Sequence, residues 1–484
     1  MHKKLSVALV AAALAAVFCQ PAFGAEILHG TELGSQVSLV YCIPFVGMLL
    51  CIAICPLVIP EKWEKWRWAF VLFWSLAFLI PFAMSFNVAT MMDQLLHSII
   101  GDYLTFIVLL FGLFCVAGNI CLEGDLAGTP KTNLVLLLIG TLLASWIGTT
   151  GASMVMIRPI LRANQWRSKC VHTVVFFIFL VSNIGGALTP IGDPPLLMGF
   201  MRGVPFQWTI IHMMPILALN VVLLLALYFL LDSRAYKKDV AAGLKPLSGG
   251  AKIRLLGAHN IIFMLMIVAA VILSGVLPML PMFQDASGNA LSLHIYGNVS
   301  LGYASIIEIV IILIAAFLSF KTTKKDVRTK NNFTWGAIEE VAVLFIGIFI
   351  TMIPALLFLN THGASLGLNQ PWQLFWCTGA LSSFLDNTPT YLVFLTVAGT
   401  LGATSGVVTT VGTVATNMLI AVSAGAVFMG ANTYIGNAPN FMVKSIAEEN
   451  KVKMPSFFGY MTWSLRFLIP LFIIDMLIFF NPFF

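Results

Sequence analysis

Charge is what this sequence has least of. Only 10% of its 484 residues are Asp, Glu, Lys or Arg, whereas 59% are hydrophobic; soluble domains carry about 25% charged residues. A soluble fold has too little core volume to bury that much apolar surface, but a spanning helix in a bilayer can be apolar all round. The composition therefore excludes an ordinary soluble protein and predicts an all-α polytopic membrane protein.

Motifs for nucleotide coupling and metal chemistry are also missing. The chain has neither a GxxxxGK[ST] phosphate loop nor an HExxH sequence. Its eight cysteines include no C-x-x-C pair of a zinc site, and most lie in or beside apolar runs. We therefore expect no enzyme activity and no cofactor, and any energy source would have to be an ion gradient.

The first 25 residues have the pattern of a signal peptide. Lys3 and Lys4 precede an apolar stretch at 5–19, and Ala22 and Gly24 frame a small-x-small cleavage pattern. The apolar stretch is short for a membrane span, so a cleaved signal peptide (1–25) is predicted rather than an anchor helix. The mature N-terminus is then expected in the periplasm of a bacterium, with the protein in the inner membrane.

The grouping of basic residues sets a topology. If residues 61–67 follow the first span into the cytoplasm, the basic clusters at 131, 158–169, 234–254, 321–330 and 444–453 fall on the same side, as the positive-inside rule requires. Only Arg202 falls outside, and Arg466 lies within the last span. The assignment requires segments 132–147 and 150–161 to form a hairpin that enters from the cytoplasm and returns to it. Segment 372–395 must enter and leave from the periplasm, so the two hairpins are expected to point in opposite directions.

Residue matching independently favours two inverted repeats. Residues 145–154 (SWIGTTGASM) align without gaps on 382–391 (SSFLDNTPTY), and 191–198 (IGDPPLLM) align on 435–442 (IGNAPNFM). The predicted order is a signal peptide (1–25), N-terminal transmembrane helices (36–97), a first repeat with the cytoplasmic-entry hairpin (98–231), a cytoplasmic loop (232–257), linking transmembrane helices (258–333), a second repeat with the periplasmic-entry hairpin (334–455) and a C-terminal transmembrane helix (456–484).

Helix-breaking residues gather at four places inside apolar sequence. These are 148–151 (GTTG), 185–195 (GGALTPIGDPP), 386–389 (DNTP) and 430–439 (GANTYIGNAP), hereafter the four breaks. Irregular backbone at membrane depth is tolerated where it is buried in protein or lines a cavity, and freed carbonyls and hydroxyls there can coordinate a cation. We therefore predict discontinuous helices around a substrate or ion site.

Asp193 and Asp386 are the strongest site candidates, because an ionisable group at membrane depth is costly and points to function. Either carboxylate could bind Na⁺ or a proton, and competition of the two ions for one group is the simplest antiport mechanism. The alternative is an Asp that only caps a half-helix. Neutral oxygens near the two acids suit sodium or protons better than soft metals, although each could simply satisfy local backbone; they belong to Asn183, Thr189, Thr149, Thr150, Ser153, Asn387, Thr388, Asn432, Thr433, Asn437 and Asn440.

Residues 183–197 (NIGGALTPIGDPPLL) closely resemble the N-x-G-G-x-x-(S/T)-P-I-G-D signature of NhaD-type sodium/proton antiporters. This branch belongs to the ion-transporter superfamily, which also includes arsenite permeases, citrate–metal symporters and sodium-coupled dicarboxylate carriers, and Asp386-Asn387 resembles its hairpin-tip pairs. The resemblance covers about residues 98–453. It implies a homodimer, a scaffold domain, a transport domain that moves as an elevator, and ion-binding positions at Asn183, Thr189 and Asp193.

The first hairpin departs from that resemblance. It reads GTTG at 148–151, where antiporters of this type are expected to show an Asp-Asn pair. The GTTGAS and GNAPN stretches resemble instead the sodium loops of carboxylate carriers, whose neutral tips leave room for an anion.

Two functions are therefore expected from the sequence, both of a secondary transporter coupled to Na⁺ or H⁺. The first is a cation/proton antiporter that uses Asp193 and Asp386. The second is a sodium- or proton-coupled symporter of citrate-like or dicarboxylate anions, in which Arg158 could neutralise the cargo. The expected partners are a small cation and proton or a carboxylate anion, the lipid bilayer and a second copy of the chain, but no nucleic acid. A membrane scaffold or sensor is disfavoured because no soluble signalling domain is present.

Overall fold

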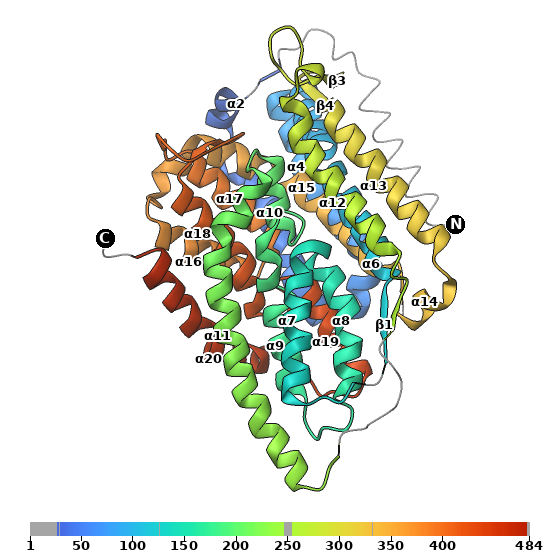
Figure 1. Cartoon of the computed structure of the whole chain (residues 1–484). Helices are drawn as coiled ribbons and strands as arrows, with labels where there is room; N and C mark the ends of the chain where they lie inside the picture. Colours follow the sequence, from blue (N-terminus) through green and yellow to red (C-terminus); the bar gives the residue numbers. More distant parts are fainter. Residues whose placement is uncertain (1–26, 29, 125, 246–253, 332, 482–484) are drawn as a thin grey trace.

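The computed structural model describes residues 27–28, 30–124, 126–245, 254–331 and 333–481 (Figure 1). The predicted signal peptide at 1–25 lies outside the described residues. The N-terminal part consists of α2 (Gly30–Gln36), η1 (Leu39–Cys42), α3 (Ile43–Val58), α4 (Pro60–Phe86), α5 (Val88–Leu96), the π-helix η2 (His97–Tyr103) and α6 (Leu104–Gly118).

The region of the first predicted repeat continues with β1 (Cys121–Glu123), α7 (Pro130–Ile147), α8 (Thr149–Ala163), α9 (Val171–Leu180), η3 (Ile184–Leu188), α10 (Pro194–Met201) and α11 (Phe206–Ala241). The linking part contains β2 (Arg254–Leu256), α12 (Asn260–Val276), η4 (Leu277–Met279), η5 (Pro281–Phe283), β3 (Ser292–Tyr296), β4 (Val299–Gly302), α13 (Tyr303–Thr322) and α14 (Lys325–Lys330). Because α11 runs to Ala241, the segment predicted as a cytoplasmic loop (232–257) begins as helix.

The region of the second predicted repeat holds α15 (Gly336–His362), η6 (Gly363–Leu366), α16 (Pro371–Ser382), α17 (Asn387–Gly399), β5 (Val407–Thr409), β6 (Gly412–Val414), α18 (Thr416–Met429), η7 (Gly430–Asn432) and α19 (Ala438–Glu449), followed by α20 (Phe457–Phe479). The strands form three antiparallel pairs, β1–β2, β3–β4 and β5–β6. In β1–β2, Cys121 lies opposite Leu256, which ties the end of α6 to the start of α12.

Ten helices among the described residues are long and apolar enough to cross a membrane. Large apolar side chains on the outer helices face outward, such as Phe73 on α4, Leu265 on α12 and Phe317 on α13, as expected of lipid-facing surfaces. In contrast, α9 is almost completely enclosed by its neighbours. The predicted class, an all-α polytopic membrane protein, is confirmed.

Two helical hairpins lie where the sequence predicts them. In the first, α7 and α8 run antiparallel and join at Gly148, whose φ of +78° and ψ of 150° are accessible mainly to glycine. Its two ends meet again, because the Gly128 N–H donates to the Ala163 carbonyl at 2.8 Å. The second hairpin, α16–α17, turns at residues 383–386. By length α7 could itself cross a membrane, so the re-entrant, opposed placement of the hairpins remains a prediction of the charge pattern.

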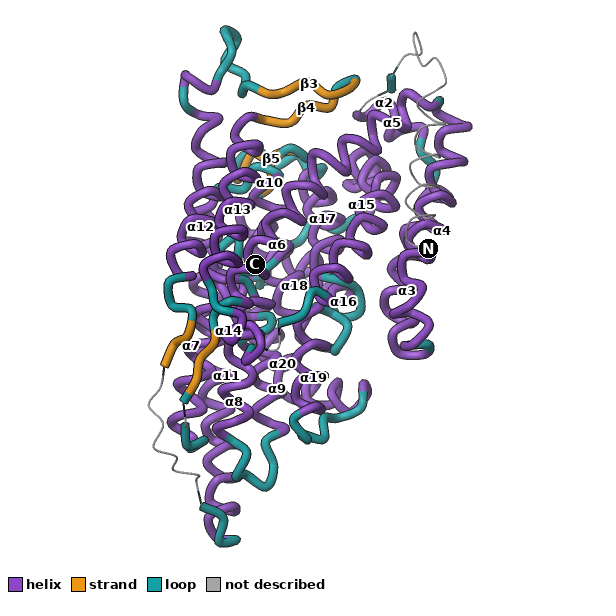
Figure 2. The backbone as a smooth tube through the Cα atoms, turned by 90° about the vertical axis from the view of Figure 1, so that its right-hand side faces the viewer, coloured by secondary structure: helices purple, strands orange, loops and turns teal. Residues whose placement is uncertain are grey.

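The elements are distributed unevenly between the two ends of the molecule. In both views the β3–β4 pair lies at one end and the end of α11 at the other, with α8, α9 and α19 nearer the α11 end (Figures 1 and 2). In Figure 1 the α7–α8 hairpin is displaced towards that end relative to α12 and α13.

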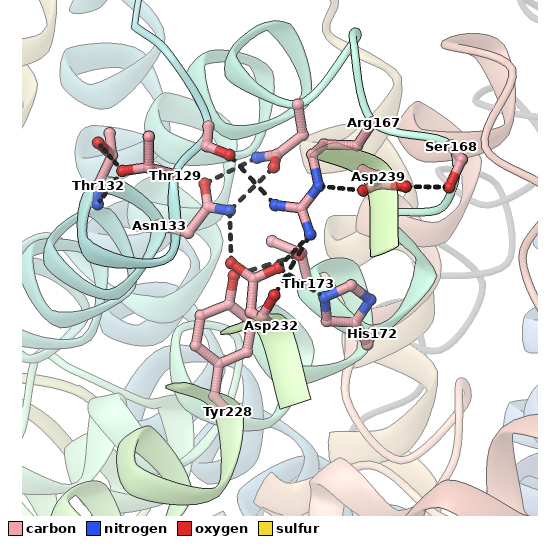
Figure 3. A network of polar contacts seen from close by, with 12 residues as sticks. Thr129, Thr132, Asn133, Arg167, Ser168, His172, Thr173, Tyr228, Asp232 and Asp239 are labelled. Carbon is pink, nitrogen blue, oxygen red and sulfur yellow. Dashed lines mark hydrogen bonds and ion pairs between the residues drawn. The ribbon is translucent and has the colours of Figure 1, made fainter. Parts of the chain in front are cut away.

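A buried ionic network holds the base of the first hairpin against α11 (Figure 3). Arg167, in the loop after α8, contacts Asp232 at 2.9 Å and Asp239 at 2.6 Å, and all three side chains are almost fully buried. Asp232 also accepts from Asn133 of α7 at 3.0 Å and lies 2.9 Å from His172 of α9. One guanidinium thus joins the hairpin, α9 and α11 into a single unit.

Candidate functional site

Each half of the chain has a hairpin-tip break and, after it, a later break; the two later breaks, 185–195 and 430–439, have the same local geometry. Asp193 precedes α10 with φ −140° and ψ 141°, and Asn437 precedes α19 with φ −147° and ψ 139°. A proline follows each of them within the first two helical positions, where its missing N–H costs nothing and its φ suits a helix start. Each break therefore ends in an extended polar residue from which a new half-helix begins.

Asp193 is the point at which all four breaks meet. Its Oδ1 accepts a hydrogen bond of 2.8 Å from the Thr149 hydroxyl and one of 3.3 Å from Asn437 Nδ2. Its Oδ2 accepts one of 3.0 Å from Asn387 Nδ2. Thr149 lies at the tip of the first hairpin, Asn387 at the tip of the second, and Asn437 in the partner break. The carboxylate is only 1% exposed, and its three side-chain donors are all uncharged.

Three asparagines brace the two later breaks against each other. Asn437 Nδ2 lies 3.2 Å from Asn183 Oδ1 and 3.1 Å from the Ser182 carbonyl. Asn183 Nδ2 in turn donates to Asn440 Oδ1 at 2.7 Å. Asn440 Nδ2 donates to two backbone carbonyls of the 430–439 break. The irregular backbone is thus satisfied by amides, which leaves its geometry well defined.

Thr189 and Thr433 play matching local roles. Thr189 donates to the Ser145 carbonyl, and Thr433 donates to the Ser383 carbonyl, so each hydroxyl ties a later break to the hairpin of its own half. These contacts make Ser383 the structural counterpart of Ser145, one residue beyond Ser382, which the sequence alignment paired with Ser145. Thr149 and Asn387, both contacts of Asp193, correspond in this register.

The other predicted site residues are placed as follows. Ser153 shares a 2.9 Å hydrogen bond with Ser182, which links α8 to the end of α9. Asn432 donates to Ser383 Oγ at 2.9 Å, and Thr388 donates its backbone N–H to Asp386. The side-chain donors to Asp193 are others, so these three residues belong to the surroundings of the site.

Asp386 is the N-cap of α17, where its Oδ1 accepts the Thr388 N–H at 3.0 Å. It also lines the same cavity as Asp193. Its ion-binding role stays a prediction.

The cavity has a volume of about 660 Å³ and separates the breaks from α3, α4, α6 and α15. Thr149, Thr150, Asp193, Asp386 and Asn437 line it on one side. Glu64 and Arg67 of α4 and Glu340 of α15 also line it. Arg158, considered from the sequence as a partner for an anion, is not a lining residue; it lies about nine residues, or roughly 13 Å, further along α8 than Thr149.

Acids outnumber bases among the few charged side chains of a largely apolar cavity lining. Its charged side chains are four acids, Glu64, Asp193, Glu340 and Asp386, and one base, Arg67. Arg67 is itself engaged, with Nη1 3.4 Å from Glu340 Oε2. Arg67 and Glu64 were not predicted as lining residues, because the basic residues of the 61–67 cluster indicate topology and nothing in the sequence places the cluster beside the breaks. The chemistry of the lining suits a cation.

Nothing in the described part of the chain forms a transition-metal centre, since no three His, Cys, Asp or Glu side chains come together there. The groups that meet the Asp193 carboxylate are the Thr149 hydroxyl and the Nδ2 atoms of Asn387 and Asn437. Carboxylate and hydroxyl oxygens are hard ligands, which favour alkali ions or protons over soft metals.

Comparison with known proteins relates this architecture to transporters. A family model described as "Putative citrate transport" matches residues 34–480. An uncharacterized transporter of Mycobacterium bovis and one of Mycobacterium tuberculosis are each 26% identical over 236 residues, which cover 46% of this chain and 54% of each relative. The chain thus spans about half the length of the curated relatives it matches. The description and both names are those of transporters, not of enzymes.

The family match runs from α2 to the end of α20 and includes all four breaks and the cavity lining. On that extent of similarity, the chain belongs to the family with the description "Putative citrate transport".

Proposed function

We propose that this protein is a secondary transporter that exchanges a monovalent cation, sodium in the first instance, for protons at Asp193, with Asp386 as the second carboxylate of the site. The observation that carries the proposal is the set of donors around Asp193. Three neutral side chains hold a buried carboxylate that forms no ion pair with a base of the described residues. A proton or a sodium ion can compensate its charge, but one carboxylate is shared by both.

The coupling of cation movement to proton movement follows from the cost of burying an uncompensated charge at membrane depth. That cost is about 3 kcal/mol or more. An empty, ionised Asp193 would oppose movement of the site through the protein. A site loaded with either ion would not carry that penalty. The carrier would then change sides only when loaded, which makes the exchange obligatory.

The fixed and moving parts are assigned from the resemblance and from the position of the cavity. The helices on its far side, α3, α4, α6 and α15, would belong to the scaffold, together with α12 and α13. The hairpins, the later breaks, α11 and α20 would form the transport domain of an elevator. Two inverted repeats and a homodimer remain parts of this proposal.

Citrate transport coupled to sodium or protons is the second candidate, and the family description favours it. A volume of about 660 Å³ lies within the range of small-molecule pockets, about 300–1,000 Å³. A citrate anion would, however, face four acidic side chains and a single arginine that already has a carboxylate partner. It would have to enter with compensating cations or protons.

The test is a flux panel with the purified full-length chain in proteoliposomes. Proton movement is recorded with a pH-sensitive dye after addition of sodium, lithium or potassium, with no organic anion present. Uptake of labelled citrate and succinate is measured in parallel, with and without sodium. Cation-dependent proton flux in the first arm supports antiport; flux that appears only when citrate is present supports the second candidate.

A further inference from the structure

Among the described residues, one ion pair connects the break region to η2, at the start of α6. Arg202 Nη2 lies 2.7 Å from Asp102 Oδ2, and both side chains are mostly buried, with 14% and 13% exposure. Arg202 is the C-cap of α10, and Asp193 is its N-cap. Asp102 belongs to the π-helix η2, a conformation found mostly as short pieces at functional sites.

Each partner is fixed to its own side of the cavity. The Arg202 carbonyl accepts the Thr410 N–H at 2.9 Å, which attaches it to the β5–β6 connection between α17 and α18. The segment around Asp102 is fixed to α15 instead. Ser98 donates to the Phe349 carbonyl at 2.9 Å, and the Tyr103 hydroxyl donates to the Ala342 carbonyl at 2.8 Å. The ion pair therefore bridges two separately anchored units.

The Arg202–Asp102 pair lies outside the cavity lining, towards the β3–β4 end of the molecule. From Asp193, α10 carries the chain about 12 Å before Arg202, and η2 packs beside β4 at the β3–β4 end of the molecule. Arg67 and Glu340 line the cavity itself, and the Glu340 side chain is 43% exposed. Arg67 belongs to the 61–67 cluster predicted to be cytoplasmic.

We infer that Arg202 and Asp102 form a gating ion pair that holds the site in its cytoplasm-facing position and must break before the site can open to the periplasm. This inference rests on the alternating access of the proposed function, but not on the identity of the cargo. Movement of α10 relative to η2 would separate the two charged groups, because their backbones are held by different elements. Arg202 and Asp102 are thus positioning residues that set the balance between two states. Arg202 is also the one basic residue outside the predicted positive-inside pattern, which a gating role explains.

The test measures that balance directly. A cysteine is placed at Thr150, on the cavity side of the first hairpin, in a background without the native cysteines. A membrane-impermeant maleimide is then applied from the periplasmic or the cytoplasmic side of oriented vesicles. The variants are Asp102→Asn, Arg202→Gln, the charge-retaining Arg202→Lys, and the exchanged pair Asp102→Arg with Arg202→Asp. Lys330→Gln is the control, because it removes an exposed ion pair between Lys330 of α14 and Glu123 of β1, neither of which lines the cavity.

We expect the ratio of periplasmic to cytoplasmic labelling to rise roughly tenfold in Asp102→Asn and Arg202→Gln, as loss of one charge-assisted hydrogen bond implies. Arg202→Lys and the control should keep the ratio of the parent protein, and the exchanged pair should return it towards that ratio. An unchanged ratio in both neutral variants, or a rise that persists in the exchanged pair, overturns the inference.

Failure of the gate and failure of the proposed function are distinguishable. If the parent protein exchanges sodium for protons while the labelling ratio does not respond, the gate is wrong and the exchanger stands. If the ratio responds while the parent protein moves no cation, the gate stands for a different cargo.

Discussion

Asn387 donates a 3.0 Å hydrogen bond to Asp193, although 194 residues separate the two in the chain. The contact joins the tip of the second hairpin to a break in the first half. Through Thr149 and Asn437, the same carboxylate also reaches the other two breaks. Four irregular segments that the sequence presents separately therefore converge on one acid, and each prediction below tests one part of that arrangement.

The two roles of Asp386 can be separated by substitution. Asparagine caps a helix about as well as aspartate, so Asp386→Asn should leave thermal stability unchanged while it removes the cavity charge. We expect the apparent KM for sodium to rise roughly tenfold, the size of one charged interaction. Asp386→Ala should additionally lower the free energy of unfolding by about 1 kcal/mol through loss of the cap. Equal transport by Asp386→Asn and the parent protein would show that the residue is only a cap.

Thr149 should act through its hydroxyl. Thr149→Val preserves the shape but removes the 2.8 Å hydrogen bond to Asp193, and we expect the apparent sodium affinity to fall roughly 10- to 100-fold, since a bond to a charged group is worth about 1.5–3 kcal/mol. Thr149→Ser keeps the donor and should stay within about threefold of the parent protein. Flux measured against sodium concentration compares the two, and similar losses in both would point to packing instead of the hydroxyl.

Gly148 should be sensitive for a conformational reason. A Cβ there would find its closest atom, the Ile191 carbonyl oxygen, at 3.6 Å, which is an ordinary contact. Its φ of +78°, however, strains any L-residue, at about 1–3 kcal/mol. Gly148→Ala should therefore lower stability by that amount and slow transport, whereas Gly243→Ala, also at positive φ but with open space around it, should affect stability alone. Unimpaired transport by Gly148→Ala would mean that the tip does not need this geometry.

The Arg167 network should contribute to stability. Arg167→Met leaves Asp232 and Asp239 buried without their guanidinium partner, and breaking a buried ion pair in this way costs about 3–5 kcal/mol. Thermal unfolding of the detergent-solubilised chain measures the effect. Lys444→Met, at a more exposed pair, is the matched control and should cost less than about 1 kcal/mol. Comparable losses in the two variants would contradict a structural role for the network.

Much of the site was predictable because broken helices leave a strong local signal. Gly, Pro, Asn and Asp in apolar sequence located all four breaks, and the cost of a charge in the membrane pointed to Asp193. The long-range pairings were not predictable. The meeting of Arg202 with Asp102, and of Arg167 with Asp232, depends on how distant helices pack, which a single sequence does not specify.

The register of the two halves shows the same limit at short range. The ungapped alignment paired Ser145 with Ser382, but the threonine contacts place Ser383 opposite Ser145. Few residues are identical between the halves, so a shift by one position changes the match very little. The hydrogen bonds of the folded chain distinguish the two registers. Thr149 and Asn387 both contact Asp193, and only the register that pairs Ser145 with Ser383 makes these two residues counterparts.

The central claim, that Asp193 binds sodium and protons in competition, is tested most directly by sodium-driven proton flux in proteoliposomes without any organic anion, comparing the parent protein with Asp193→Asn. The account predicts proton movement that depends on sodium in the parent protein and is lost in Asp193→Asn, while Asp285→Asn in the exposed β3-side loop retains it. Sodium-dependent proton flux that survives in Asp193→Asn, or a parent protein that moves protons only when citrate is supplied, would contradict it.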